Sequence, residues 1–177
     1  MKTFPRRTYT SARAFFSELF YLLKNRTSIK RAMRGELISP AFRERLMMVV
    51  TEVNDCRYCR SFHVPQAVDC GLSEEEIQDI LAGQLPETAP EEEIPALAYA
   101  QHWAEEDAQP DPEYRAEVED CYGKETFAAV ETVLKMIRMG NLMGNTGDYL
   151  LYRLSFGRWG QGGSSSQHPR PELEEEK

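Results

Sequence analysis

Hydrophobic residues along the chain repeat with the three- to four-residue spacing of one α-helical face. The clearest case lies in residues 124–145, where a single stripe holds Phe127, Val130, Leu134 and Ile137. No stretch alternates hydrophobic and polar residues with the period of two that a half-buried strand requires. The pattern therefore predicts an all-α protein with little or no sheet.

Capping residues mark where several of these helices begin. Ser39-Pro40 and Asp111-Pro112 each combine an N-cap side chain with a proline at the first helical position, and Ser73 with Glu76 forms a capping box. These signals and the hydrophobic spacing predict a bundle of six to eight helices. The predicted helices cover residues 11–24, 28–34, 39–54, 56–71, 73 onward, 90–107, 111–122 and 124–145.

The longest apolar run, residues 14–23, is too short to span a membrane and contains Glu18. A transmembrane helix needs about 20 consecutive apolar residues. Glu18 also interrupts the apolar segment that a signal peptide requires. We therefore expect no membrane segment, no export and a cytoplasmic location.

The net charge of −8 is unevenly distributed along the chain. Residues 1–50 carry +8, from 11 basic and 3 acidic residues, whereas the remaining 127 residues carry −16. An acidic protein is a poor general nucleic-acid binder, so we expect the basic side chains to form ion pairs within the chain or with another copy. These side chains are Arg6, Arg7, Lys30, Arg31 and Arg34. The same separation of charge, with the small residues between Gly140 and Gly147, predicts a homo-oligomer.

Two of the four cysteines form a Cys56-x-x-Cys59 pair directly after the turn residues Asn54-Asp55. This position places both thiols in the first turn of a helix, where unpaired N–H groups and the helix dipole stabilise a thiolate. His63 follows Cys59 by four residues and shares its helical face. Four residues after Cys56 the chain has Arg60, which cannot take up a proton. We therefore expect Cys59, with His63 beside it, to be the thiol that ionises more readily.

Three kinds of site are compatible with this pattern. The two cysteines can form a reversible redox disulfide, with His63 as a base. A zinc site can use the same three residues with a fourth ligand from Cys70, Cys121 or His102. The third possibility is a structural pair of buried cysteines beside a hydrogen-bonded histidine. Cysteine-rich zinc sites usually have a second close-spaced ligand pair, which this sequence lacks, so the redox pair is favoured and the other two stay open.

The full motif, Glu44 followed after eleven residues by Cys56-x-x-Cys59-x-x-x-His63, resembles a known family signature. It is similar to that of the alkylhydroperoxidase D-like (AhpD-like) branch of the carboxymuconolactone decarboxylase superfamily, and Tyr58 before the second cysteine also fits. The resemblance covers residues 40–83, and more weakly the segment 124–154.

This resemblance implies an oligomeric all-α bundle, usually a trimer or a hexamer. Residues 36–156 would form the AhpD-like domain. Residues 1–35 would be an N-terminal helical extension, and the Gly/Ser/Glu-rich residues 157–177 would be a flexible tail.

The resemblance also implies a thiol-dependent peroxidase or disulfide reductase with an antioxidant role. Its substrates would be hydroperoxides or disulfides, its electrons would come from a thiol donor, and its only redox group would be the Cys56–Cys59 disulfide. By resemblance, Cys59 attacks the substrate, Cys56 resolves the intermediate, and Glu44 with His63 forms a proton relay. Decarboxylase members generally lack the cysteine pair, so a lyase is a less favoured alternative, as is a non-catalytic or zinc-stabilised scaffold. No bound metal, nucleic acid or membrane partner is expected.

The partner of the histidine has two candidates. At 1.5 Å per residue, Glu44 lies about 15 Å before the end of its helix, whereas His63 lies about 10 Å into the next one. Glu52 is nearer the turn and is the second candidate, although the resemblance selects Glu44.

The other candidate residues point to packing. His102 is expected to be a surface or interface histidine, and Cys70 and Cys121 are expected to be small buried residues. Gly140-x-x-x-Gly144 is expected to allow a close helix or subunit contact.

Overall fold

The computed structural model describes residues 4–160. Within this range the chain forms seven α-helices, one short 3-10 helix and no strand, which confirms the predicted all-helical class. The elements are α1 (Ala12–Lys24), α2 (Arg26–Met33), α3 (Pro40–Asn54), α4 (Arg57–Asp69), α5 (Glu74–Leu81), η1 (Glu91–Glu93), α6 (Ile94–Glu105) and α7 (Pro112–Leu154).

The predicted capping residues start their helices as expected. The Ser39 hydroxyl accepts the N–H of Phe42 at 3.0 Å. The Ser73 hydroxyl accepts the N–H of Glu76 at 3.1 Å, and the Glu76 carboxylate accepts the N–H of Ser73 at 2.9 Å. Each interaction satisfies a backbone donor that the first helical turn leaves unpaired.

Helix α7 differs from the two separate helices predicted from the sequence. Gly123, with φ 73° and ψ 156°, breaks its helical geometry at the predicted boundary. The second part continues to Leu154, beyond the predicted end near residue 145. The ring of Phe4 packs against Tyr149 and Tyr152, with ring centroids 5.5 Å and 5.7 Å apart. These contacts come from the other end of the chain, so the local sequence pattern could not reveal them.

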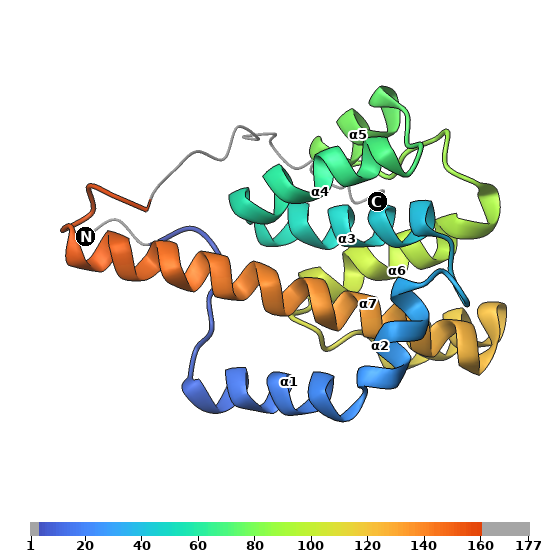
Figure 1. Ribbon diagram of the computed structural model, residues 1–177, viewed down its shortest axis with the longest axis horizontal. Helices are drawn as coiled ribbons and strands as arrows, with labels where there is room; N and C mark the ends of the chain where they lie inside the picture. Colours follow the sequence, from blue (N-terminus) through green and yellow to red (C-terminus); the bar gives the residue numbers. More distant parts are fainter. Residues whose placement is uncertain (1–3, 161–177) are drawn as a thin grey trace, which may run out of the picture.

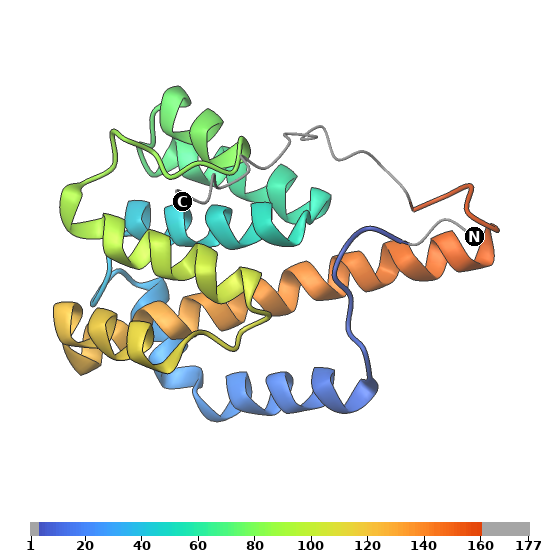
Figure 2. The same cartoon turned by 180° about the vertical axis from the view of Figure 1, so that it is seen from behind.

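The long helix α7 organises the molecule. Helices α3 and α4 lie on one side of it and α1 lies on the other, as the two opposite views in Figures 1 and 2 both show. Helix α2 also packs against α7. The side of α7 that faces α3 and α4 is therefore where residues of the C-terminal half can reach the Cys56–Cys59 turn.

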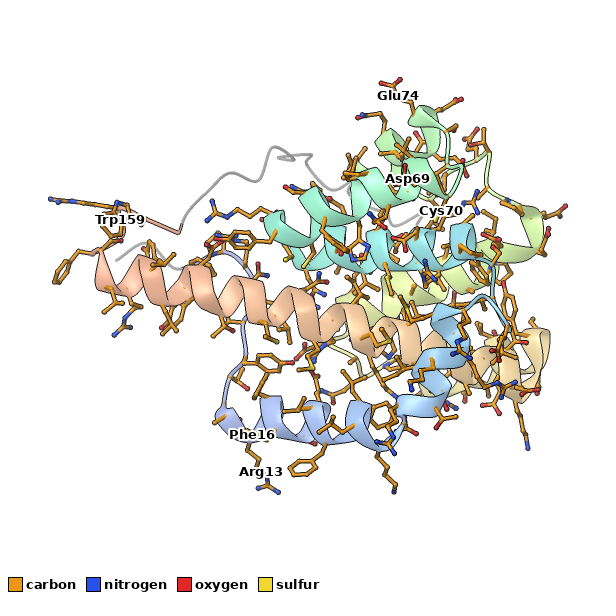
Figure 3. All side chains as sticks on the ribbon, viewed as in Figure 1. Arg13, Phe16, Asp69, Cys70, Glu74 and Trp159 are labelled. Atoms are coloured by element: carbon orange, nitrogen blue, oxygen red, sulfur yellow. The ribbon has the colours of Figure 1, made fainter. Side chains whose placement is uncertain are left out.

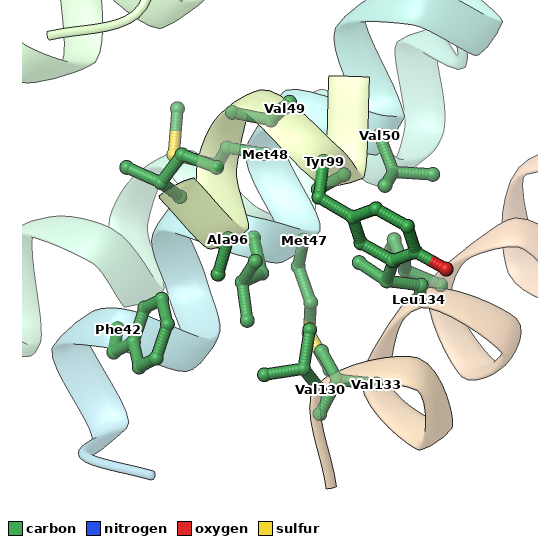
Figure 4. Close-up of a cluster of buried hydrophobic side chains, with 14 of the residues drawn as sticks. Phe42, Met47, Met48, Val49, Val50, Ala96, Tyr99, Val130, Val133 and Leu134 are labelled. Carbon is green, nitrogen blue, oxygen red and sulfur yellow. The ribbon is translucent and has the colours of Figure 1, made fainter. Parts of the chain in front are cut away.

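The hydrophobic core lies where α3, α6 and α7 meet (Figure 4). Side chains that are at most 4% exposed come from all three helices, among them Val50, Tyr99 and Leu134. Burying a large apolar side chain stabilises the fold by roughly 1.5–3 kcal/mol. Helix α3, which carries Glu44, is thus fixed on two sides and is a rigid support for the site.

The predicted ion pairing of the basic N-terminal region is found within the chain. The guanidinium of Arg6 lies 2.7 Å from the carboxylate of Asp148, and both side chains are buried. Arg7 donates to the backbone carbonyl groups of Ala104 and Glu105. Arg31 pairs with Glu125 on α7 at 2.7 Å. The N-terminal segment and helix α2, which lie outside the motif region, are therefore connected to α6 and α7 by charged groups.

The end regions are described only in part. Residues 161–177 of the predicted tail, and residues 1–3, lie outside the described residues. Trp159, at the end of the described chain, projects beyond α7 (Figure 3) and is 67% exposed. Between residues 4 and 160, no helix is both long enough and apolar enough to cross a membrane.

Candidate functional site

The turn between α3 and α4 folds back along the last turn of α3. Asp55 adopts the left-handed conformation, with φ 50° and ψ 47°. The N–H of Asp55 donates to the carbonyl of Glu52 at 3.0 Å, and the N–H of Cys56 donates to the carbonyl of Thr51 at 3.3 Å. Helix α4 consequently begins beside the last turn of α3. His63 therefore reaches Glu44, although helix lengths alone predict an offset of about 5 Å between the two residues.

Cys56 is the N-cap residue of α4. Its sulfur accepts the backbone N–H of Cys59 at 3.3 Å, so it occupies the position that a serine or aspartate side chain holds at most helix starts. Cys56 is fully buried, whereas Cys59 is partly exposed and packs at the edge of the core. Both thiols are free, and the Cys59 thiol hydrogen-bonds to the Cys56 sulfur.

The two thiols have opposite tendencies to ionise. The hydrogen bond from Cys59 lowers the pKa of Cys56 most; burial opposes this, and the backbone N–H of Cys59 and the side chain of Asn141 lower it further, to about 7. The pKa of Cys59 is raised, because its proton is engaged by Cys56 and because the thiol is buried. The sequence led us to expect Cys59 to ionise more readily; in this geometry the pKa of Cys56 is the one that is lowered, by the hydrogen bond from Cys59 and by the backbone N–H that its sulfur accepts at the N-cap.

His63 and Glu44 form a buried pair between α4 and α3. Nδ1 of His63 lies 2.8 Å from Oε2 of Glu44, and the residues are 9% and 3% exposed. Arg43 donates to Oε1 of Glu44 from two nitrogens, at 3.2 Å and 3.1 Å. Burial raises the pKa of Glu44, but the hydrogen bonds and positive charges of His63 and Arg43 outweigh it and hold the pKa below its ordinary value. An ionised carboxylate therefore orients the imidazole.

Glu52, the second candidate for the histidine's partner, pairs with another residue. Its Oε2 lies 2.7 Å from the guanidinium of Arg60, which also lies 3.4 Å from the carboxylate of Asp55. This ion-pair group stabilises the turn that carries Cys56. The partner of His63 is Glu44, as the resemblance indicated.

Tyr58, between the two cysteines, is bound to α7 through Asp148. The Tyr58 hydroxyl donates to Oδ1 of Asp148 at 2.8 Å, and Arg57 donates to the same oxygen at 2.7 Å. Asp148 is completely buried, and its other oxygen binds Arg6. Burial raises the pKa of Asp148, but the hydrogen bonds from Tyr58, Arg57 and Arg6 prevail and lower it. Asp148 thus links the N-terminal segment to the turn that holds the cysteines.

Sequence reasoning missed three residues of α7 that contact the cysteine turn: Asp148, Asn141 and Asn145, whose amide donates to the carbonyl of Asn54 at 2.7 Å. Asn141 is fully buried, donates to the hydroxyl of Thr51 at 3.1 Å and accepts from the amide of Asn54 at 3.1 Å. The available signal was the helical spacing of Asn141, Asn145 and Asp148, which places three polar residues on one face of α7. Gly144 was recognised only as a close-contact residue. A Cβ atom there would lie 3.1 Å from the sulfur of Cys56, so the predicted close contact is made within the chain, against the cysteine turn.

The remaining candidates lie apart from this site. His102 is partly exposed, and its Nε2 accepts the N–H of Asp111 at 3.2 Å, which agrees with a surface role. Cys70, at the end of α4 (Figure 3), is partly buried. Cys121 is exposed, so its predicted burial is wrong. It lies on the outer side of the first part of α7, next to the break at Gly123.

Within residues 4–160, no group of three or more His, Cys, Asp or Glu side chains is arranged to hold a metal ion, so the zinc alternative gains no ligand set there.

Comparison with known proteins places the motif region in a family. Residues 22–106 match the family model of the carboxymuconolactone decarboxylase family. This range includes Glu44, both cysteines of the pair and His63. No curated protein and no solved structure shows significant similarity to the chain. The match covers 85 of the 177 residues and, together with the all-helical fold, agrees with the resemblance to the carboxymuconolactone decarboxylase family.

Proposed function

We propose that the protein is an AhpD-like thiol oxidoreductase that reduces hydroperoxides or disulfides through Cys56 and Cys59. The observation that carries this proposal is the position of the two cysteines at the N-terminus of α4, where the Cys56 sulfur accepts the backbone N–H of Cys59 at 3.3 Å. One helical turn further along the same helix, His63 is held by the buried Glu44 carboxylate. Two adjacent thiols, a stabilised thiolate and an oriented base are the groups that dithiol chemistry requires.

The chemistry with a hydroperoxide consumes one peroxide for each disulfide formed. A thiolate attacks the outer oxygen of the substrate, the O–O bond breaks, and the alcohol leaves after taking a proton. The sulfur is then a sulfenic acid, and the second cysteine attacks it to form the disulfide and release water. An external dithiol returns two electrons and two protons, which restores both thiols.

We assign the attack to Cys59 and the resolving step to Cys56. Cys59 is the partly exposed member of the pair, whereas Cys56 is fully buried and out of reach of a substrate. The hydrogen bond between the sulfurs provides a route by which the proton of Cys59 can pass to Cys56, leaving a thiolate on the accessible sulfur. The low pKa of Cys56 suits the second step, in which a thiolate must attack the sulfenic acid.

His63 and Glu44 would serve as the proton relay. Because Glu44 accepts a hydrogen bond at Nδ1 of His63, Nε2 is the nitrogen left to exchange a proton. The imidazole would take up the first proton that the cysteine pair releases and return it to the leaving alkoxide. Glu44, ionised and held by Arg43, would stabilise the imidazolium that forms between these steps.

A homo-oligomer, as a trimer or hexamer, is part of this proposal, as is a reducing compartment such as the cytoplasm. Large apolar side chains are exposed on α1 and at the end of α7, including Phe20 at 70% and Leu154 at 78%. Surfaces of this kind are typical of protein contacts. Light scattering at micromolar concentration should give a multiple of 20.3 kDa, and a monomeric mass would contradict this part of the proposal.

The proposed activity can be tested by following thiols and peroxide together. Reduced protein is mixed with cumene hydroperoxide or a small disulfide, and mass spectrometry locates any new bridge. We expect a Cys56–Cys59 disulfide, one substrate molecule consumed per bridge, and turnover when a dithiol is added.

Single serine variants of Cys70 and Cys121 provide matched controls. They remove thiols that lie outside the site, and both should retain full activity. If no Cys56–Cys59 bridge forms with either substrate class, or if Cys59→Ser retains the activity, the proposal is wrong.

A further inference from the structure

Asn141 brings a buried amide from α7 to the cysteine turn, 85 positions after Cys56 in the chain and outside the family-matched segment. Its side chain is 0% exposed. Its Oδ1 accepts the amide N–H of Asn54 at 3.1 Å, and its Nδ2 donates to the hydroxyl of Thr51 at 3.1 Å. In this orientation the amide oxygen faces Asn54 and the amide nitrogen faces Thr51.

The Asn141 side chain also acts on the two thiols, since hydrogen bonding from it lowers the pKa of both Cys56 and Cys59. Gly144 independently confirms that this face of α7 lies against the pair. It lies three residues further on, and a Cβ there would come within 3.1 Å of the Cys56 sulfur. The absence of a side chain at residue 144 lets α7 approach closely enough for Asn141 to reach the thiols.

We propose that Asn141 is a further residue of the site, whose amide N–H binds whichever of the two sulfurs carries the negative charge. An N–H donor held in a buried site stabilises an anion without reorganisation during the reaction. The charge moves between Cys56 and Cys59 as the disulfide forms, and Asn141 can follow it because its side chain lowers the pKa of both thiols and lies one helical turn from Gly144, which faces the Cys56 sulfur. Its role in turnover rests on the proposed dithiol function, whereas its effect on thiol ionisation does not.

The test is the pH at which the pair forms its first thiolate, followed by the ultraviolet absorbance of thiolate in reduced protein. We call the pH at which half of the protein carries this first thiolate the thiolate midpoint. Asn141→Ala removes the donor, and we expect the thiolate midpoint to rise by about one to two pH units, the effect of losing one hydrogen bond to a charged group. Asn141→Asp has nearly the same shape and can accept from Thr51 and Asn54, but it sets a carboxylate against the sulfurs. Its midpoint should rise further still.

Asn145→Ala is the matched control. Asn145 is also on α7 and 0% exposed, and its amide donates to the backbone carbonyl groups of Asn54 at 2.7 Å and of Arg7 at 3.0 Å. This variant should lose stability while its thiolate midpoint stays at the wild-type value. Asn141→Ser, which keeps a short hydroxyl, supplies the same measurement if the other Asn141 variants fail to fold.

The two possible failures can be distinguished. An unchanged midpoint in folded Asn141 variants, or an equal rise in Asn145→Ala, overturns the role of Asn141. A raised midpoint without any peroxide or disulfide turnover in the wild type would support the role of Asn141 and overturn the proposed function alone. If the wild type turns over, Asn141→Ala should lower the rate of disulfide formation by roughly 10²- to 10³-fold at neutral pH.

Discussion

Nδ1 of His63 lies 2.8 Å from Oε2 of Glu44, so a histidine on α4 and a glutamate on α3 form one buried unit. Arg43 holds the other carboxylate oxygen at 3.1 Å. This arrangement fixes which nitrogen of the imidazole is engaged and leaves Nε2 for proton transfer. The pair lies on the two helices joined by the cysteine turn, so the base and the thiols share one rigid support.

Glu44→Gln should slow the oxidation of Cys59 by about 10- to 100-fold, the usual loss when a group that orients a histidine is replaced. Glutamine keeps the shape but removes the negative charge that stabilises the imidazolium. The rate of disulfide formation after addition of hydroperoxide measures this effect. Glu52→Gln is the control, since Glu52 pairs with Arg60, and its rate should stay within about twofold of the wild type. An equal loss of rate in the two variants would contradict the assignment of Glu44 as the residue that orients His63.

The residues that are adjacent in sequence could be recognised before the structure was known. Cys56, Cys59 and His63 lie within one helix, so their spacing alone brings them to one region. Glu44 needed the family resemblance, because simple helix lengths left it about 5 Å from the histidine. The missing information was the backbone of the turn, in which Asp55 is left-handed and the N–H of Cys56 donates to the carbonyl of Thr51, because this geometry sets how α4 packs on α3.

The residues contributed by α7 could not be predicted from the motif. Asp148 reaches Tyr58 across 90 positions of the chain, and no periodic pattern encodes such a contact. The extension of α7 to Leu154 has the same cause, since it is stabilised by the N-terminal Phe4 and Arg6. The order in which the thiols ionise depends on which sulfur accepts the helix N–H, and that is decided by the turn rather than by spacing.

The serine variants of the two cysteines should separate attack from resolution. In Cys59→Ser protein, hydroperoxide should produce neither turnover nor sulfenic acid, because the remaining thiol is fully buried. In Cys56→Ser protein, Cys59 should oxidise once and accumulate as sulfenic acid, since the resolving thiol is absent. A sulfenic-acid reagent with mass spectrometry distinguishes the two products. Rapid oxidation of Cys56 in the Cys59→Ser protein would reverse the roles.

Asp148→Ala should lower the free energy of unfolding by about 3–5 kcal/mol at pH 7, since it leaves buried Arg6 without its partner. Because the pKa of Asp148 is lowered in the folded protein, its stabilisation is present above the unfolded pKa of about 3.9. It is lost as the pH falls through the lower folded value. The difference between wild type and variant in denaturant unfolding should therefore shrink below about pH 4.

Asp120→Ala is the control for this measurement. Asp120 is exposed on the first part of α7, and its replacement should change stability by no more than about 0.5 kcal/mol at any pH. A loss in Asp148→Ala that stays constant from pH 7 to pH 3 would show that its carboxylate is not the source of the effect.

Gly144→Ala should disturb the cysteine pair, whereas Gly140→Ala should not. A Cβ at residue 144 lies 3.1 Å from the sulfur of Cys56 and 3.3 Å from the Cδ2 of Tyr58, so the turn must move by a few tenths of an ångström. Such overpacking typically costs about 1–3 kcal/mol. It should also weaken the hydrogen bond from the Cys59 N–H to the Cys56 sulfur, so the thiolate midpoint should rise from about 7.

At residue 140 no atom lies within 4 Å of an added Cβ, and alanine there should stabilise the helix by roughly 0.5–1 kcal/mol. Denaturant unfolding and thiolate absorbance on both variants check these outcomes. A midpoint in Gly144→Ala that equals the wild-type value would mean that the sulfur tolerates the added methyl group and that the close approach of α7 does not control its ionisation.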